Sequence, residues 1–181
     1  MTYALTLVPA LDRPDLLADP VRAAIAGLGV AATHIQVAEI DPELADTAAF
    51  CARYQVPLEE SGNCVLIAGK RGGETRMAAA LVLATTRADV NGALRRQLDV
   101  RKASFASREV ATRDTGMDYG GITPLGLPAG WPVYLDKAAA TAERLVIGSG
   151  VRRSKLVLPA SVLTALPAVT VVDGLATPVG L

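Results

Sequence analysis

The sequence is poor in the residues that most often carry metal or thiol chemistry. Its 181 residues include two cysteines and one histidine. Cys51 and Cys64 form neither a CxxC pair nor a disulfide framework, and isolated cysteines of this kind are usually buried as small hydrophobic residues. His34 cannot form a multi-histidine site alone, and the alternating stretch around it predicts the surface of a strand. Because dinucleotide fingerprints are also missing, we expect no metal and no organic cofactor.

Aromatic residues are scarce as well, and the chain has no net charge. Only 4% of the residues are aromatic and the formal net charge is zero. The core must therefore come mainly from Ala, Val, Leu and Ile, and no aromatic stacking platform is predicted. A neutral chain also lacks the overall attraction of a protein that coats nucleic acid. Local basic clusters at 95–113 and 152–155 fit either phosphate binding or solvated helix faces.

Long apolar runs are missing too, although 51% of the residues are hydrophobic. No run is long enough to span a bilayer, and the start at Met1 lacks the basic and apolar regions of a signal peptide. We therefore expect no membrane association and a cytoplasmic protein. The length suits one compact domain over residues 1–181.

Helix and strand signals alternate along the chain. Caps and glycine stops predict helices at 19–27, from Asp46 through Phe50 and Tyr54, at 89–98, at 107–116, in the Ala-rich stretch after 136 and after Pro159. Apolar runs predict strands at 3–8, 34–37, 64–68, 75–84, 102–105, 131–135 and 144–148, another short strand after the 149–152 turn, and a last strand at 169–172. The strands at 64–68 and 75–84 should form an antiparallel hairpin across the turn at 70–74. We expect a mixed α/β (α+β) fold with a curved, partly barrel-like mixed sheet flanked by helices.

The segment 117–128 is rich in glycine and proline and yet apolar, which is unusual for a solvent loop. Gly120, Gly121 and Gly126 allow close approach of the backbone to a ligand, Pro124 stiffens the loop, and the Thr123 hydroxyl can orient a group. Their amides could stabilise the charge that develops on an ester carbonyl. From spacing alone, a packed turn without a ligand explains the same residues.

This loop carries a family resemblance. The run from Thr115 through Gly120-Gly121-Ile122-Thr123-Pro124-Leu125-Gly126, followed by Trp131-Pro132-Val133-Tyr134-Leu135-Asp136, resembles the YbaK (YbaK/EbsC) family of aminoacyl-tRNA editing domains, which includes the prolyl-tRNA synthetase-associated domain. The resemblance covers residues 30–173 and is weaker over residues 1–29. It implies hydrolysis of the ester bond of a misacylated tRNA in trans, with the aminoacylated 3′ end of tRNA as partner and an aminoacyl-tRNA synthetase as a further partner. Water, or the ribose 2′-hydroxyl, would act on the ester.

The resemblance suggests three groups of site residues. The catalytic group is Asn63, Gly120, Gly121 and Thr123. The substrate-binding group is Pro124, Gly126, Gly148, Ser149, Gly150 and Lys155. The nucleic-acid-binding group is Arg101, Lys102, Arg152 and Arg153.

The chain departs from the family pattern at polar positions. Active relatives carry a lysine where this chain has Asn63, and asparagine keeps hydrogen-bonding capacity without the positive charge. One hypothesis is an altered enzyme in which Lys155, Lys102 or Arg152 supplies the missing charge. A second is a binding module that holds an aminoacyl-tRNA or an amino-acid-like ligand without turnover. A third is an interaction protein whose apolar loop is a partner surface.

Overall fold

The structure is a computed structural model that describes residues 3–179. Met1, Thr2, Gly180 and Leu181, which fall within the predicted domain 1–181, lie outside the described residues. The helices are α1 (Asp19–Ala26), α2 (Thr47–Tyr54), α3 (Arg95–Gln97), α4 (Arg108–Thr115), α5 (Lys137–Ala140) and α6 (Ala160–Thr164). The strands are β1 (Val8–Pro9), β2 (Gln36–Glu39), β3 (Gly62–Arg71), β4 (Glu74–Leu83), β5 (Thr86–Ala88), β6 (Ala103–Phe105), β7 (Val133–Asp136), β8 (Leu145–Gly148), β9 (Ser154–Leu158), β10 (Val169–Val172) and β11 (Ala176–Pro178).

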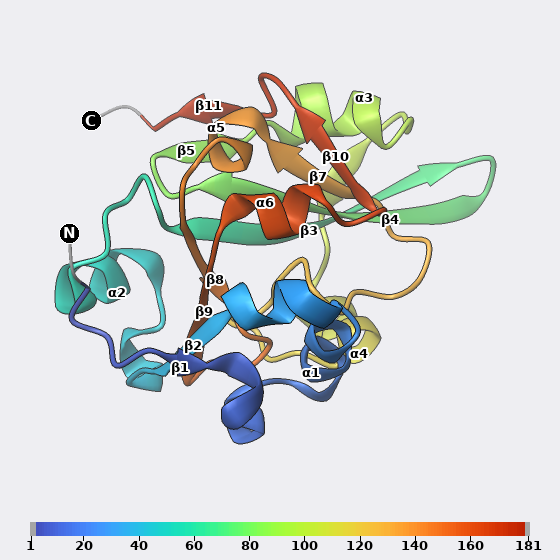
Figure 1. Cartoon of the computed structure of the whole chain (residues 1–181). Coiled ribbons are helices and arrows are strands. Elements are labelled where there is room, and N and C mark those ends of the chain that lie inside the picture. Colours follow the sequence, from blue (N-terminus) through green and yellow to red (C-terminus); the bar gives the residue numbers. More distant parts are fainter. Residues whose placement is uncertain (1–2, 180–181) are drawn as a thin grey trace.

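The strands form a four-stranded sheet in the order β1-β2-β9-β8, a five-stranded sheet in the order β10-β7-β4-β3-β6, and the pair β11-β5. In the five-stranded sheet β7 runs parallel to both β4 and β10, while β3 and β4 form the predicted antiparallel hairpin. The hairpin crosses the molecule and projects beyond the other elements (Figure 1). The mixed α/β fold is confirmed. The strands are split over three sheets, however, and no sheet within residues 3–179 closes into a barrel.

The two larger sheets meet at the start of β3. An isolated parallel bridge joins Ser61 to Val146 of β8, and the Val146 amide donates to the carbonyl oxygen of Glu60 at 2.7 Å. Asn63 follows two residues later. The predicted site residue on β3 therefore lies directly beside the junction, which we call the seam between the sheets.

Apolar side chains from both sheets pack into one large cluster. It also receives Val21 and Ile25 from α1, both fully buried. The other main contributors are Leu81, Leu135, Ala139, Leu145, Ile147, Leu156, Leu158, Val162 and Leu163. As expected from the composition, this core contains no aromatic side chain among its described members. Burial of this aliphatic surface is the main favourable contribution that holds the sheets together.

The predicted helix signals are present at α4. The Ser107 hydroxyl accepts from the Val110 amide at 3.3 Å, and Gly116 ends the helix in the left-handed conformation with φ of 66°. Asp89 likewise accepts from the amides of Gly92 and Ala93, although the turn it caps, Val90–Leu94, is π-helical before it continues as α3. Local capping chemistry thus sets where these helices begin and end.

Three strand predictions were wrong. Of the predicted strand at 3–8 only Val8 belongs to a strand, β1, which pairs with β2. His34 is exposed as predicted, but it ends the 3₁₀ helix Gly29–His34 instead of lying on a strand. The strand at 169–172 is not the last, because β11 follows and pairs with β5. Strands of two or three residues are too short to show a sequence period. Between residues 3 and 179, no helix has the length and apolar character needed to cross a membrane.

Candidate functional site

A cavity of about 450 Å³ lies next to the seam. Its walls come from the start of α2, the first half of β3, the end of β6, α4, the loop 117–128, and the facing ends of β8 and β9. Four predicted site residues line it together: Asn63, Gly120, Gly148 and Lys155. The other lining residues are Ala45, Asp46, Thr47, Gly62, Cys64, Val65, Leu66, Phe105, Ala106, Ala111, Tyr119 and Ile122.

Asn63 forms the β3 wall and has a fixed orientation. Its Oδ1 accepts a hydrogen bond of 2.9 Å from the Thr47 hydroxyl at the start of α2. This bond assigns the oxygen to one side of the amide, so that Nδ2 is left to donate elsewhere. Nδ2 donates to no side chain or backbone group within residues 3–179 and is available to a ligand.

The neighbouring cysteine is not poised for nucleophilic attack. Burial raises the pKa of the Cys64 thiol to about 12. A thiol with such a pKa is protonated at neutral pH, and the thiolate is the nucleophilic form. Cys51 lies nearby, is buried as predicted, and its thiol pKa is raised mainly by desolvation. Both cysteines are therefore apolar parts of this region.

The amides of the paired glycines in the loop are used differently. The Gly121 amide donates to the Asp118 carbonyl at 2.9 Å and closes a turn. The Gly120 amide, by contrast, has no partner among the described residues, and Gly120 has φ of 89°. Of the two predicted donors, Gly120 is thus free to bind a ligand while Gly121 is used within the loop.

The loop is anchored to the β8–β9 turn, residues 149–153, through the backbone. The Gly150 amide donates to Gly121 O at 2.7 Å, and the Asp118 amide donates to Gly150 O at 2.8 Å. A side chain on Gly148 would collide with the carbonyl oxygens of Gly121 and Ile122. A Cβ atom on Gly121 would lie 2.6 Å from the Val151 carbonyl carbon. Glycine is required at both positions because two backbones meet there without room for a methyl group.

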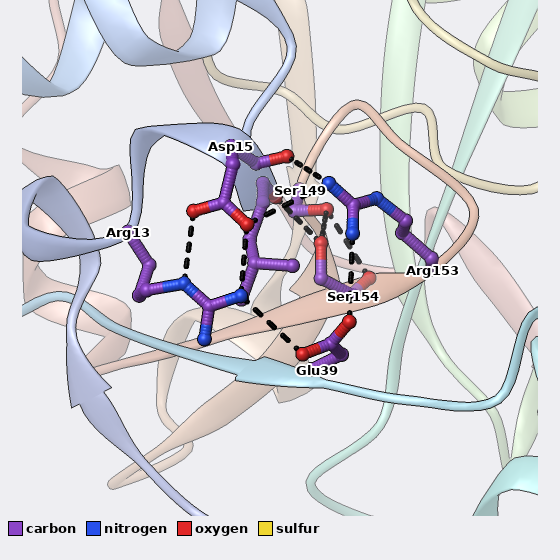
Figure 2. A network of polar contacts seen from close by, with 7 residues as sticks. Arg13, Asp15, Glu39, Ser149, Arg153 and Ser154 are labelled. Carbon is purple, nitrogen blue, oxygen red and sulfur yellow. Dashed lines mark hydrogen bonds and ion pairs between the residues drawn. The ribbon is translucent and has the colours of Figure 1, made fainter.

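A buried polar network holds the β8–β9 turn from behind (Figure 2). The hydroxyls of Ser149 and Ser154 lie 2.6 Å apart, and the Ser154 hydroxyl is also 2.6 Å from the Leu16 carbonyl oxygen, which accepts from it. Both serines are almost fully buried. Arg153 extends the network to the carbonyl oxygen of Asp15 at 2.6 Å and to Glu39 at 3.4 Å. Ser149 and Arg153 therefore fix the turn instead of facing the cavity.

Lys155 is the cation inside the cavity. It lies on β9 between β2 and β8, paired with Ala38 and Gly148. Its ammonium donates to the Ala45 carbonyl at 3.3 Å and lies 5.2 Å from the centre of the Phe50 ring. No carboxylate in the described part of the chain forms an ion pair with it. Desolvation lowers the pKa of Lys155, an effect that Cys51 opposes and Arg152 reinforces. A partly desolvated, unpaired ammonium is costly to bury and is typical of a ligand site.

Arg152 lies at the edge of the cavity. Its guanidinium packs against Gly120, and Nη2 lies 3.3 Å from Oδ1 of Asp46. Its backbone amide also donates to Asp118 Oδ2 at 3.1 Å. Arg152 is therefore close enough to the mouth to contact a ligand that extends out of the cavity.

Several predicted residues lie away from this cavity. The Thr123 side chain is fully buried, and its hydroxyl has no hydrogen-bond partner among residues 3–179. Pro124 and Gly126 line a separate cavity of about 220 Å³ near α1. Gly150, with φ of 87°, packs against Ala18. These residues contribute to the packing of the loop and turn.

Arg101 and Lys102 lie towards the hairpin tip. Both are exposed, and the Lys102 carbonyl lies against Gly69 of β3. Gly69 is six residues from Asn63 along the strand, a span of about 20 Å at roughly 3.4 Å per residue. Arg101 and Lys102 are thus far from the cavity, beside the part of β3 that leads to the hairpin tip.

Several cavity residues were not predicted. Thr47 follows the predicted cap Asp46, but only the fold brings it to Asn63. Phe105 and Tyr119 also line the cavity, and their exposed fractions are 57% and 52%. The low aromatic content had led us to expect no exposed aromatic surface. The available signal was an aromatic residue two positions before the cap Ser107 and another directly before Gly120. Residues 3–179 contain no cluster of His, Cys, Asp and Glu side chains suited to a metal ion.

The chain is similar to known proteins of one family. Residues 41–166 match the model of a family described as the aminoacyl-tRNA editing domain. All residues that line the cavity fall within this range. No curated protein sequence matches the chain.

Solved structures share the fold. A protein described as a candidate trans-editing enzyme for prolyl tRNA synthetase aligns with a TM-score of 0.73 and 22% identity, over 86% of this chain and 94% of the other. A protein described as hypothetical aligns with a TM-score of 0.75 and 15% identity, over 88% of this chain and 100% of the other. A structure from work on epitope grafting onto scaffold proteins aligns with a TM-score of 0.73 and 22% identity, over 86% and 95% of the two chains.

Proposed function

This chain belongs to the aminoacyl-tRNA editing domain family, and from that premise we propose that it hydrolyses the ester bond of a misacylated tRNA in trans, in the cavity beside Asn63. One observation carries the proposal. Gly120 with its free amide, Asn63 with its free Nδ2 and Lys155 with an ammonium that pairs with no carboxylate in residues 3–179 all line one cavity of about 450 Å³. Hydrogen-bond donors and a cation that pairs with no carboxylate suit an ester carbonyl that becomes negatively charged.

The reaction needs little beyond positioning and charge stabilisation, because an aminoacyl ester is already activated. Water attacks the carbonyl carbon, and the negative charge on the carbonyl oxygen is stabilised by the Gly120 amide and by Lys155. The carbon–oxygen bond to the ribose then breaks. The ribose oxygen takes up one proton and the attacking water gives one up, so the products are free amino acid and deacylated tRNA.

Lys155 is the best replacement for the lysine that the family carries at position 63. Lys102 lies about 20 Å away along β3, at roughly 3.4 Å per residue, and Arg152 is paired with Asp46. Lys155 reaches the cavity from β9, on a different sheet from Asn63. Asn63, held by Thr47, keeps a neutral donor at the original position.

A binding module without turnover is the second candidate, and the polar groups of the cavity favour it in one respect. Hydrolysis is faster when a general base accepts a proton from water. The Cys64 thiol is held protonated, and the Asp46 carboxylate is exposed and paired with Arg152. If the ribose 2′-hydroxyl does not assist, the cavity would hold an aminoacyl-tRNA without cleaving it.

The nucleic acid would extend from the cavity towards the basic residues. Arg152 lies at the mouth and would contact the last phosphates, while Arg101 and Lys102 would reach the acceptor stem. Arg153 contributes less, because it is already paired with Asp15 and Glu39. Such contacts make binding weaker as salt concentration rises. An aminoacyl-tRNA synthetase that releases the mischarged tRNA would be a further partner.

The test is a deacylation screen with purified protein and a panel of mischarged tRNAs that includes cysteinyl-, alanyl- and seryl-tRNA. At least one substrate should be cleaved, and Lys155→Met should slow its cleavage about 100- to 1000-fold, the usual cost of losing one group that stabilises an oxyanion. The matched control is Lys137→Met, since Lys137 is exposed and paired with Asp173. If no tRNA is cleaved, the hydrolase proposal is wrong.

The same preparation separates the two candidates. A binding module would bind an uncleavable aminoacyl-adenosine analogue without releasing amino acid from any tRNA. Asn63→Lys restores the family residue, and activity that appears only in this variant would select the binding module for the natural chain.

A further inference from the structure

Phe105 and Tyr119 differ from the other exposed large hydrophobic side chains of residues 3–179 because these two line the cavity. The other large residues at this cavity, Leu66 and Ile122, are buried or half-buried. Phe105 and Tyr119 both line the cavity and are more than half exposed. We call this pair the aromatic rim. Exposed apolar surface that borders a cavity usually marks a binding site.

The backbone that carries each ring is fixed even though the ring is exposed. Phe105 ends β6 and is paired with Ile67 of β3, and the next amide, that of Ala106, donates to Leu66 O at 2.9 Å. Tyr119 lies between Asp118, whose amide donates to Gly150 O, and Gly120. The backbone at each ring therefore has a defined position before a ligand arrives, which lowers the entropy lost on binding.

Arg108 connects the two sides of the rim. Its guanidinium carbon lies 5.0 Å from the centre of the Tyr119 ring, a cation–π contact. Arg108 is the first residue of α4, and Phe105 precedes it by three residues. The Tyr119 ring thus folds back along α4 towards the end of the helix that follows Phe105.

The chemistry of the proposed substrate decides what reaches the rim. If the ester carbonyl binds the Gly120 amide, the ribose is one bond beyond the ester oxygen and the base is one bond beyond the ribose. Tyr119 is the residue next to Gly120, so the base comes to lie at the rim. We propose that Phe105 and Tyr119 hold the base of the 3′-terminal nucleotide by stacking, an inference that rests on the proposed function.

The charges at the mouth fit a nucleotide. Arg108 and Arg152 are exposed or half-exposed cations there. The nearby carboxylates, Asp46 and Asp118, both accept hydrogen bonds from Arg152. Two aromatic faces beside cations are the usual platform for a single-stranded base and its phosphate, and stacking accepts any base without reading its edges.

The experiment measures binding of two uncleavable probes to the full chain. The first is 3′-aminoacylamino-3′-deoxyadenosine, in which an amide replaces the ester, and the second is the same compound without the base. Phe105→Ala and Tyr119→Ala should each weaken binding of the first probe about 5- to 100-fold and leave binding of the second unchanged. Tyr119→Phe and Phe105→Tyr should retain wild-type affinity because each keeps an aromatic face. Val30→Ala is the control, as Val30 is 80% exposed and does not line the cavity.

Three results would overturn the proposal. The wild type could bind both probes equally, the alanine variants could lose both probes equally, or they could lose neither, which would assign the rings to another class of partner such as an apolar protein segment. The outcome is independent of turnover. Base-dependent binding without deacylation would reject the hydrolase and keep the rim, whereas deacylation that is indifferent to both rings in KM and kcat would do the reverse.

Discussion

The β8–β9 turn supports the cavity from behind, the aromatic rim lines it, and the two are built in opposite ways. The buried hydroxyl of Ser149 in the turn bonds to that of Ser154 at the start of β9, and the Ser154 hydroxyl also donates to the Leu16 carbonyl oxygen. At the rim, Phe105 and Tyr119 present more than half of their surface to solvent. The polar groups of the turn are hydrogen-bonded within the chain, while the aromatic rings of the rim are exposed and free to contact a ligand. The comparison separates groups that fix the cavity from groups left free to bind.

This difference predicts which substitutions lower stability and which alter binding or rate. Changes in the turn should lower the free energy of unfolding, because they leave buried polar groups unpaired or force backbones apart. Changes at the rim and at Lys155 should alter binding or rate while the fold persists. The strongest test is therefore made where the turn meets the glycine loop.

Gly148→Ala should have the largest effect on stability. The added methyl group would collide with two carbonyl oxygens of the glycine loop, neither of which can move without its backbone. We expect the free energy of unfolding to fall by about 3 kcal/mol, measured from urea unfolding midpoints at unchanged slope. Gly174→Ala is the control, since Gly174 has φ of 69° but open space around it. Its left-handed backbone alone should cost about 1 kcal/mol. Equal losses in the two variants would contradict the close approach described for Gly148.

Ser154→Ala should have an intermediate effect. The substitution leaves the buried Leu16 carbonyl oxygen without its Ser154 donor and removes one contact of the Ser149 hydroxyl, which keeps its bonds to the carbonyl oxygens of residues 151 and 154, at a cost of about 2 kcal/mol. Ser161→Ala removes the same hydroxyl from an exposed position of α6 and should change stability by less than about 0.5 kcal/mol. A Ser154 variant as stable as the Ser161 variant would show that the turn is not held by this network.

The smallest expected effect is a shift in the pH dependence of the deacylation rate, with the fold unchanged. Burial lowers the pKa of Lys155 below its ordinary value of 10.5, and only the protonated form stabilises an oxyanion. The deacylation rate, corrected for spontaneous hydrolysis, should therefore fall as pH rises through a pKa lower than that of a free lysine. In Lys155→Arg this fall should vanish, since a guanidinium does not lose its proton in this range.

Stability should change in the opposite direction over the same interval. Between the lowered pKa of the folded state and 10.5, the unfolded chain binds more protons at Lys155 than the folded chain does. The contribution of this residue to the free energy of unfolding then increases with pH. A rate that falls together with stability would mean that unfolding, and not Lys155, causes the loss.

Local signals predicted much of the fold. Ser107 and Gly116 mark the ends of α4, and the turn at 70–74 places the β3–β4 hairpin, because each depends on chemistry within a few residues. The division into separate sheets and the pairing of β5 with β11 were missed. These pairings join strands of two to five residues across long stretches of chain, and no local pattern encodes them.

The candidate site was predictable to a similar extent. The resemblance selected Asn63, Gly120, Gly148 and Lys155, which the fold brings to one cavity. It also selected Gly126 and Ser149, whose contacts are made within the protein because a glycine or a serine looks the same in sequence whether it faces a ligand or a neighbouring backbone. The aromatic rim is visible only in three dimensions, since Phe105 lies before α4 and Tyr119 lies in the loop after it.

The seam has a consequence for how the two halves of the cavity stay aligned. Asn63 belongs to one sheet and Lys155 to the other, and the bridge between Ser61 and Val146 connects those sheets two residues from Asn63. Sliding one sheet past the other would misplace the amide relative to the ammonium, and it would also break the hydrogen bond from Val146 to Glu60. The spacing of the two polar groups thus depends on the same contacts that join the sheets. Loss of these contacts would disrupt the whole cavity and not one of its walls alone.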